Sequence, residues 1–318
     1  MPAQLANLNS TNVRNAMLLA LTRLQVSLSA ALAPRAAVDK ATRLFLTPPR
    51  FDHSQREREL LATGRGFVVD APHARLSAWR FGRSDRPAVI LSHGWGGRGA
   101  QFRRFVPALV DAGYQVIVFD HSAHGHSEGH ESSLVHFIRD VEAVALDLRI
   151  KGVTIAGAIG HSLGAAALGG WLKRAGSGVR TVMIAPPHSL GRYAGRFARM
   201  LGLPERLRRE MQARIERRFG VAWSEFELPQ AVAGITSPTL VIHDESDREV
   251  PLASGLALAR ALPDARFLRT SGLGHRAILR DESVIADAID FLKGEVIFAA
   301  PPAAGAGLGF AAAPAPLL

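Results

Sequence analysis

A serine flanked by two glycines is the feature of this sequence that most directly indicates chemistry. The pentapeptide GHSLG follows an apolar run and precedes an alanine-rich run, so Ser162 is expected at a sharp turn from a strand into a helix. Such a turn strains the serine backbone and tolerates only small residues two positions to either side, which accounts for Gly160 and Gly164. The following helix directs the positive end of its dipole towards a developing oxyanion. We predict that Ser162 is a nucleophile.

A neutral serine needs a general base, and the base needs an acid that orients it. His275 lies in the glycine-rich stretch SGLGH after the last expected strand, and it is the only one of the twelve histidines so placed. Asp247 lies in the stretch HDESDREVP after the preceding expected strand, where Asp244 and Glu245 share the loop. The chain order of serine, aspartate and histidine fits this kind of turn. We predict that His275 is the base and Asp247 the orienting acid.

Two backbone N–H groups are needed to bind the oxyanion that forms when a serine attacks a carbonyl. The first expected donor is the N–H of Leu163, immediately after the nucleophile. The second is expected in the stretch HGWGG at 93–97, which follows the apolar run AVILS. Glycines there let the main chain approach a substrate, and we predict that the N–H of Trp95 completes the oxyanion hole.

Short β-rich runs alternate with longer helical patterns through most of the chain. Strands are expected at 67–70, 76–79, 88–92, 115–119, 153–159, 179–184, 239–243 and 265–269. Helices are expected at 101–112, 135–149, 165–175, 252–262 and 283–292. Apolar strands separated by helices are typical of a parallel sheet that is covered on both faces. We predict an α/β fold with a mostly parallel, twisted sheet flanked by helices, and with Ser162, Asp247 and His275 at its carboxyl edge.

One interruption of this alternation divides the chain. The pattern from 188 to 234 is helical and highly charged, with no expected strand. We predict that 188–234 form a helical cap inserted between the two core segments 66–187 and 235–294. Residues 1–65 are expected to form an N-terminal helical extension, and 295–318 a low-complexity Ala/Pro/Gly tail.

These stretches together resemble the α/β-hydrolase superfamily over about residues 66–293. The resemblance is carried by HGWGG, DHSAHGHS at 120–127, GHSLG, GLGH and the Asp247 loop. The family commonly has D-x-x-G-H-G-x-S, a structural run, where this chain has Ala123 in place of the first glycine. The resemblance implies an esterase-like or lipase-like serine hydrolase that needs no cofactor and has a helical cap over its pocket. Ser162 distinguishes the chain from the dehalogenases and epoxide hydrolases of this superfamily, which have aspartate at that position.

The expected reaction is hydrolysis of a carboxylic ester through an acyl-enzyme on Ser162. Thioester, amide and carbon–carbon bond cleavage and perhydrolysis use the same triad, and a non-catalytic ligand-binding homologue is a further alternative. The short turn at Trp95, rather than a longer glycine run, resembles esterases of small or medium acyl groups. A small-molecule ester is therefore the expected partner. The sequence leaves the acyl chain, the leaving group and the oligomeric state open.

Composition excludes several other classes of function. The chain has no cysteine, which excludes disulfides and thiolate chemistry and fits a cytoplasmic location. Its formal net charge is +10, but zinc-finger spacing, RNP-like aromatics and a Walker sequence are missing, so no nucleic-acid partner is expected. Four histidines crowd one stretch of the sequence, but no carboxylate ligand pattern frames them, so no metal is expected; they are His121, His124, His126 and His130.

The stretch from Ala16 to Ala33 is apolar but interrupted by Arg23 and Gln25, which argues against a membrane span. We predict an amphipathic helix packed on the domain. A weak association with a membrane surface, through this helix and the basic cap, is the alternative. Residues 192–218 of the cap hold nine arginines against three glutamates, for which a solvated helix face is the favoured interpretation.

Overall fold

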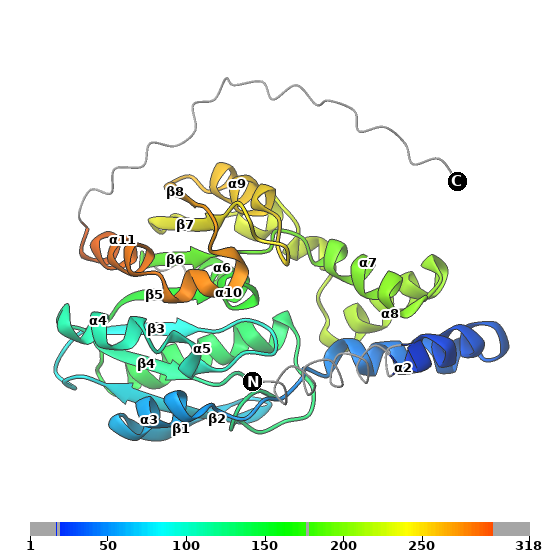
Figure 1. Cartoon of the computed structure of the whole chain (residues 1–318), viewed down its shortest axis with the longest axis horizontal. Coiled ribbons are helices and arrows are strands. Elements are labelled where there is room, and N and C mark those ends of the chain that lie inside the picture. Colours follow the sequence, from blue (N-terminus) through cyan, green and yellow to red (C-terminus); the bar gives the residue numbers. More distant parts are fainter. Residues whose placement is uncertain (1–16, 18–19, 176–177, 295–318) are drawn as a thin grey trace, which may run out of the picture.

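An eight-stranded sheet runs through the computed structural model, which describes residues 17, 20–175 and 178–294 (Figure 1). The strands lie in the order β1-β2-β4-β3-β5-β6-β7-β8. Their bounds are β1 Arg65–Ala71, β2 Ala74–Phe81, β3 Ala88–Ser92, β4 Gln115–Phe119, β5 Ile155–His161, β6 Arg180–Ile184, β7 Thr239–Asp244 and β8 Ala265–Thr270. β2 pairs antiparallel with β1 and β4, whereas all pairs from β4 to β8 are parallel. The predicted α/β fold with a mostly parallel sheet is confirmed.

The central strands are buried on both faces because their apolar residues alternate between two cores. In β3, Ala88 and Ile90 belong to one core, while Val89 and Leu91 belong to the other. The first core is covered by α5 (Leu134–Ile150), α6 (Leu163–Ala175) and α9 (Leu252–Ala261). The second is covered by α3 (Gln55–Thr63), α4 (Phe105–Asp111) and α11 (Glu282–Lys293). This double burial explains the continuous apolar strands.

The expected bounds of one helix and one strand are wrong. The helix expected at 101–112 is a short 3-10 turn, η1 (Gly99–Phe102), followed by α4. Pro107 has no N–H to donate, and it is accommodated in the first turn of α4, so the helix begins just before it. The strand expected at 153–159 lies two residues further along the chain, as β5, and reaches the residue before Ser162.

The insertion after β6 holds the helices of the predicted cap. It contains α7 (Leu190–Leu201), α8 (Glu205–Phe219) and the short turns η2 (Trp223–Phe226) and η3 (Gln230–Val232). Helical residues 20–32 and α2 (Pro34–Leu46) lie beside α7 and α8, at the right of Figure 1. Val26 and Leu46 share a hydrophobic core with Leu207 and Met211 of α8. The N-terminal segment therefore packs on the insertion, while the division of the chain into extension, core, cap and tail stays a prediction.

The remaining short helices are α10 (Gly274–Ala277) and η4 (Ile278–Arg280), which precede α11. Among the described residues, no helix combines the length and apolarity needed to cross a membrane. The predicted tail at 295–318 lies outside the described residues.

A buried ion pair fastens α3 to the loop after β3. Glu57 Oε2 accepts hydrogen bonds from Nε and Nη2 of Arg98 at 2.9 and 2.7 Å, and from the Ser54 N–H at 2.7 Å. Burial raises the pKa of the Glu57 carboxyl, but the hydrogen bonds from Ser54 and Arg98 lower it more, so its pKa lies below the usual value. Because the folded state favours the carboxylate, this contact stabilises the fold above the unfolded pKa, and the stabilisation is lost as the pH falls.

We therefore expect Glu57→Gln to lower the free energy of unfolding by about 2 kcal/mol at pH 7, where charge-assisted hydrogen bonds are lost. The difference from wild type should shrink below about pH 4, where the unfolded carboxyl of the wild type takes up a proton. Urea unfolding at several pH values measures both. Glu59→Gln is the matched control, because Glu59 is exposed on the same helix and bonds only Gln55. An equal loss at pH 7 and pH 3.5 would contradict the assignment.

Candidate active site

Ser162 occupies the turn between β5, which ends at His161, and α6, which begins at Leu163. Its φ is +53°, a left-handed conformation that is strained for any residue with a side chain. The Ser162 N–H donates to the carbonyl of Ile184 on β6 at 2.9 Å, and the Ser162 carbonyl accepts from the Ala165 N–H at 2.9 Å. The strand–turn–helix predicted around Ser162 is therefore present, and neighbouring elements hold its strained backbone.

The flanking glycines are required by close backbone approach. A Cβ on Gly160 would lie 2.7 Å from backbone atoms of Ala165, and a Cβ on Gly164 would lie 2.2 Å from the carbonyl oxygen of Ser92. A Cβ on Gly94 would lie 2.8 Å from the Cβ of Ser162. The ends of β3 and β5 and the start of α6 thus meet with no room for a side chain between them.

Asp247 and His275 lie in direct contact. Their Oδ2 and Nδ1 atoms are 2.7 Å apart, and both side chains are buried. The other carboxylate oxygen, Oδ1, accepts the N–H groups of Glu249 and Val250 at 2.8 and 2.9 Å. Burial raises the pKa of Asp247, but hydrogen bonds from His243, His275 and the Val250 N–H outweigh it, so the pKa lies well below the usual value. Asp247 is consequently a carboxylate at neutral pH.

His161 connects this pair to the serine turn. Its Nε2 lies 2.8 Å from the backbone oxygen of His275, and the two imidazole rings have centroids 4.6 Å apart. Burial lowers the pKa of His161 to about 3, so its ring is neutral. Because His161 is the residue before Ser162, this contact places the His275 loop beside the nucleophile turn.

Two residues that support the loops were missed by sequence reasoning. Asp244, considered only as a rival for Asp247, accepts the N–H groups of Leu273 and Gly274 at 3.0 and 2.8 Å and thereby holds the loop before His275. His243 Nε2 lies 3.0 Å from the Val250 oxygen and 3.5 Å from Asp247 Oδ2. The spacing of four residues between His243 and Asp247 was the available signal.

Leu163 and Trp95 line the same cavity as Ser162, which agrees with their predicted place in the oxyanion hole. In the HGWGG turn, the Gly96 N–H donates to Nε2 of His124 at 3.0 Å, and the Gly97 N–H donates to the Gly94 oxygen at 2.9 Å. Those two amides already have acceptors in the protein. That the N–H groups of Leu163 and Trp95 bind an oxyanion stays a prediction.

Two of the four clustered histidines, His121 and His124, form hydrogen bonds with the end of β3 and the HGWGG turn. His121 is fully buried, and its Nδ1 and Nε2 lie 3.0 Å from Asp140 Oδ2 and 2.9 Å from Ser92 Oγ. Burial lowers the pKa of His124 to about 4, so its ring is neutral and Nε2 can accept the Gly96 N–H. These contacts give the histidines a structural role.

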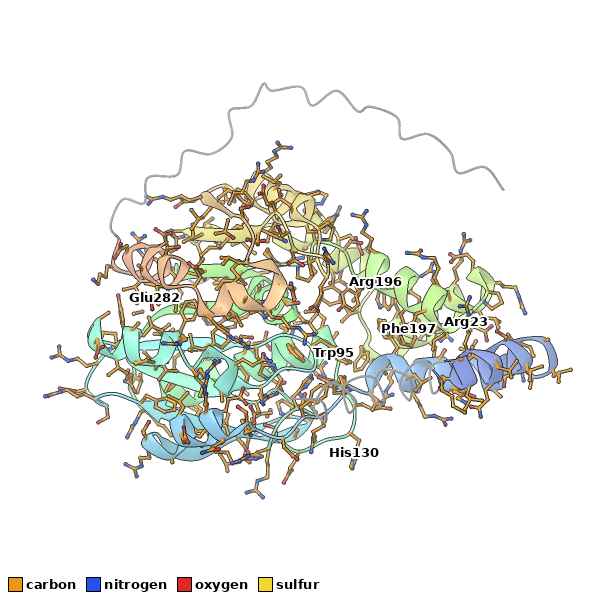
Figure 2. All side chains as sticks on the ribbon, viewed as in Figure 1. Arg23, Trp95, His130, Arg196, Phe197 and Glu282 are labelled. Atoms are coloured by element: carbon orange, nitrogen blue, oxygen red, sulfur yellow. The ribbon has the colours of Figure 1, made fainter. Side chains whose placement is uncertain are left out.

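Another group of side chains combines two histidines with a carboxylate. His53, Asp120 and His126 have ligand atoms within 4.8 Å of one another and could hold a metal ion. However, His53 Nδ1 lies 3.3 Å from His126 Nε2, while His53 Nε2 lies 3.7 Å from Asp120 Oδ2. The hydrogen bond between His53 and His126 already engages one nitrogen of each ring, so the group fits a histidine pair beside Asp120 better than a metal site. His130 is exposed at the edge of the molecule (Figure 2).

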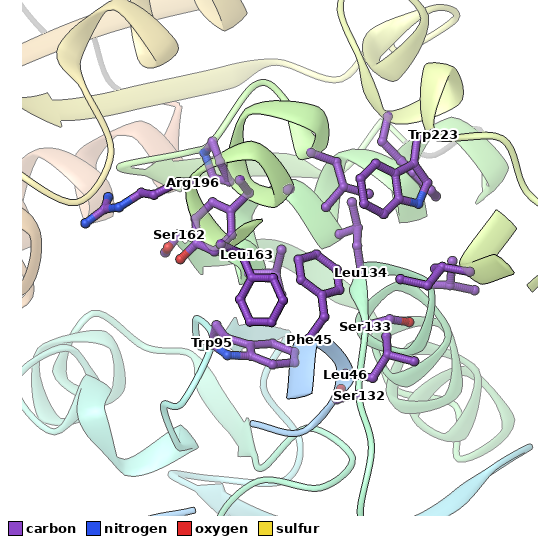
Figure 3. A pocket seen from close by; sticks show the side chains of 18 of the residues that line it. Phe45, Leu46, Trp95, Ser132, Ser133, Leu134, Ser162, Leu163, Arg196 and Trp223 are labelled. Carbon is purple, nitrogen blue, oxygen red and sulfur yellow. The ribbon is translucent and has the colours of Figure 1, made fainter. Parts of the chain in front are cut away.

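A cavity of about 400 Å³ opens beside Ser162. Figure 3 shows Ser162 and Arg196 towards one side of the cavity, Trp223 on the opposite side, and Phe45 and Trp95 between them. The lining is largely apolar and combines the inserted helices with the N-terminal segment and the central sheet region. An apolar cavity with a few polar groups at one end is the usual form of a small-molecule site.

Comparisons with known proteins agree with this architecture. Residues 87–225 match the family model described as alpha/beta hydrolase fold, and residues 222–296 match the model described as TAP-like protein. The chain belongs to the α/β-hydrolase superfamily. The turn that carries Ser162 follows a central strand of this sheet and lies between β5 and α6.

Several relatives cover most of this α/β-hydrolase. A non-heme haloperoxidase of Rhodococcus erythropolis is 26% identical over 263 residues, which cover 66% of this chain and 93% of that protein. A monoacylglycerol lipase of Mycolicibacterium smegmatis is 25% identical over 244 residues, 64% of this chain and 86% of that protein. An esterase structure of Pyrococcus furiosus has a TM-score of 0.61 at 22% identity, covering 78% of this chain and 99% of that one. Two shorter matches span only 33% and 31% of the proteins concerned. The relatives support hydrolase activity.

The close backbone approach at Gly164 can be tested by stability. We expect Gly164→Ala to lower the free energy of unfolding by at least about 2 kcal/mol, because its Cβ would overlap the carbonyl oxygens of Ser92 and His93. Gly169→Ala in the same helix is the control: its Cβ would meet its nearest neighbour, Met183, at 3.9 Å. That substitution should stabilise the protein by about 0.5–1 kcal/mol. Equal effects of the two substitutions in urea unfolding would disprove the packing argument.

Proposed function

We propose that this α/β-hydrolase cleaves a carboxylic ester through an acyl-enzyme on Ser162. The observation that carries the proposal is the 2.7 Å contact between His275 and Asp247, on loops that His161 joins to the serine turn. An ionised Asp247 fixes the imidazole with its Nδ1–H towards the carboxylate, which leaves Nε2 free to accept a proton. A strained serine beside such a base is suited to nucleophilic attack.

In the proposed mechanism, His275 takes the proton of the Ser162 hydroxyl as its oxygen attacks the ester carbonyl carbon. The N–H groups of Leu163 and Trp95 bind the oxyanion, and the dipole of α6 adds to this stabilisation. His275 then gives the proton to the leaving alcohol as the carbon–oxygen bond breaks. Water, deprotonated by the same imidazole, attacks the acyl-enzyme and releases the acid with the serine hydroxyl restored.

The preference for an ester rests on the site and on relatives. The cavity beside Ser162 is largely apolar, which suits the chain of a lipid-like ester. Relatives include proteins named lipase and esterase, and a carboxylesterase-like hydrolase is the activity we propose. The haloperoxidase name makes perhydrolysis the rival, in which hydrogen peroxide replaces water at the acyl-enzyme. A cytoplasmic location stays a prediction from the lack of cysteine.

Stopped-flow kinetics with p-nitrophenyl esters test the acyl-enzyme. Wild type should release a burst of p-nitrophenol and become covalently labelled by a fluorophosphonate, whereas Ser162→Ala should lose the label and about 10⁶-fold in kcat. Asp247→Asn should lower kcat by about 10³–10⁴-fold, because the imidazole is no longer held in the right tautomer.

Glu245→Gln is the matched control for Asp247, since Glu245 is on the same loop and its side chain bonds Arg269 and Ser271. It should stay within about twofold of wild type, as surface substitutions usually do. Esters left intact and a Ser162 that takes no fluorophosphonate would refute the proposed function. Faster turnover of the acyl-enzyme by hydrogen peroxide than by water would replace hydrolysis with perhydrolysis.

A further inference from the structure

We propose that the N-terminal segment at 44–49 is a wall of the substrate pocket and that Phe45 limits the length of the apolar chain that the pocket accepts. The substrate class is then an ester that carries a long apolar chain. This inference rests on the proposed ester hydrolysis. The segment precedes the residues matched by the alpha/beta hydrolase model, which begin at 87.

The lining of the cavity places this segment in the site. Five of its residues contact the cavity that contains Ser162: Leu44, Phe45, Leu46, Thr47 and Pro49. Across from them, the cap contributes Phe197 from α7, Phe219 from α8 and Trp223 from η2. The pocket therefore lies between the N-terminal segment and the cap, and the core supplies Ser162.

Phe45 is the centre of an aromatic cluster that spans this pocket. Its ring meets the edge of Phe197 at a centroid distance of 5.1 Å and stacks on Trp223 at 5.8 Å. Figure 3 shows Phe45 projecting between Trp95 and Leu134. A ring in this place closes the apolar side of the pocket, so its size decides how far a chain can extend from Ser162.

The wall is firmly held. The Leu46 carbonyl accepts the Ser132 N–H at 2.7 Å, which ties the end of α2 to the loop before α5. Arg50 donates through Nη2 to the carbonyl oxygens of Ser127 and Gly129, at 2.9 and 3.1 Å. An ion pair between Asp39 and Arg214 joins α2 to α8. A wall fixed at both ends can select chains by size, because it does not yield to a longer one.

The polar end of the pocket shows which way an ester would lie. Arg196 and Glu249 line the cavity near Ser162, and Arg196 Nη1 donates to the Glu249 carbonyl at 3.1 Å. The charged groups lie at that end, whereas the far side is lined mainly by aromatic and aliphatic side chains together with the uncharged Ser132 and Ser133. We therefore expect the ester carbonyl and the polar part of the substrate to bind at the charged end, and the apolar chain to contact Phe45 and Trp223.

The test measures kcat/KM for p-nitrophenyl esters with acyl chains of 2 to 16 carbons, and for acetates of alcohols of the same lengths. In wild type, kcat/KM should rise with chain length in one of the two series, which tells whether the acid or the alcohol part carries the chain. Phe45→Ala should move the optimum to longer chains and change the ratio between the longest and shortest substrates by at least about tenfold. Phe51→Ala is the control, because Phe51 is 56% exposed and does not line the cavity.

Fatty-acid binding to Ser162→Ala, followed by tryptophan fluorescence, tests the pocket without turnover. There the Phe45→Ala change should again alter affinity in a length-dependent way. Esters cleaved with no length preference, or a Phe45→Ala effect equal at all lengths, would overturn this inference and leave the proposed function standing. A failure of Ser162 to react with a fluorophosphonate would instead remove the proposed function. Unchanged thermal unfolding of each variant shows that it is folded.

A second surface feature, independent of the pocket, is a row of exposed leucines on the helix at 20–32. Leu21, Leu24 and Leu28 are 49–56% exposed, and their spacing of three and four residues places them on one helix face. Val26, which is fully buried, lies on the opposite side at 3.6 residues per turn. Val26 belongs to the hydrophobic core that this helix forms with α2 and α8, so the leucines on the other side of the helix face away from that core.

We infer that this leucine face docks on an anionic lipid surface. The two helices are basic. Arg23, Arg35 and Arg43 are exposed on them, although Arg23 points towards Gly202 rather than along the leucine face, and the one acidic residue in the described part of these helices, Asp39, is paired with Arg214. The net charge of +10 favours an anionic surface over a second, equally basic copy of this chain. An apolar face on a basic helix is the usual form of an interfacial helix.

Co-sedimentation of the full chain with vesicles tests the docking surface. Binding is expected to vesicles that contain phosphatidylglycerol and to be weaker with pure phosphatidylcholine. The double variant Leu24→Gln/Leu28→Gln should bind at least about tenfold more weakly, because two leucines no longer enter the lipid. Leu146→Gln is the control, since Leu146 is 55% exposed but lies on α5.

Three outcomes would overturn the lipid assignment. Binding that is absent, or the same in the double variant and wild type, excludes these leucines as the docking face. A dimer that depends on the leucines, seen by light scattering, assigns the face to a second copy. A lower thermal unfolding temperature of the isolated double variant shows that the leucines are covered within the chain.

Discussion

The structure depends on a close approach of three backbone segments at the middle of the sheet. The carbonyl oxygens of Ser92, the last residue of β3, and of His93 lie directly against Gly164 at the start of α6. Any side chain at Gly164 would push α6 away from β3 and displace Leu163, the residue before it. Since the strained Ser162 also donates to Ile184 on β6, the turn is held from both neighbouring strands. Strain of this kind persists only where the surroundings fix it in this way.

Buried histidines surround the close backbone contact at Gly164 and hold the neighbouring loops. Burial keeps the pKa of His93 well below its usual value, and its Nε2 accepts the His121 N–H at 3.0 Å. His121 in turn meets Asp140, a buried carboxylate to which the Ser122 N–H also donates. The result is a buried polar network that joins the HGWGG turn to α5, and its hydrogen bonds favour one arrangement because breaking them would leave further buried groups unpaired. His161 and His243 play a comparable part around Asp247 and His275.

The pocket belongs to no single segment. Its reactive end is built on the core, one side on the inserted helices and another on the N-terminal segment, and the aromatic contacts of Phe45 join the last two. The hydrophobic core shared by α2 and α8 makes the N-terminal helices and the inserted helices α7 and α8 one packed unit. Ala123, which stands where the superfamily commonly has glycine, has a left-handed φ of +63°, a conformation that glycine adopts readily.

The sequence by itself determined the fold class and the positions of Ser162, Asp247 and His275, because both follow from local patterns. Strand rhythm identifies the βα loops, and parallel strands bring the carboxyl ends of those loops to one edge. Only the tertiary structure decided that Asp244, the last residue of β7, holds the loop before His275, whereas Asp247 contacts the imidazole as predicted. It also decided that His161 supports His275 and that Phe45 reaches the pocket. Those contacts join residues more than a hundred positions apart, and no periodicity in the sequence encodes a distance of that kind.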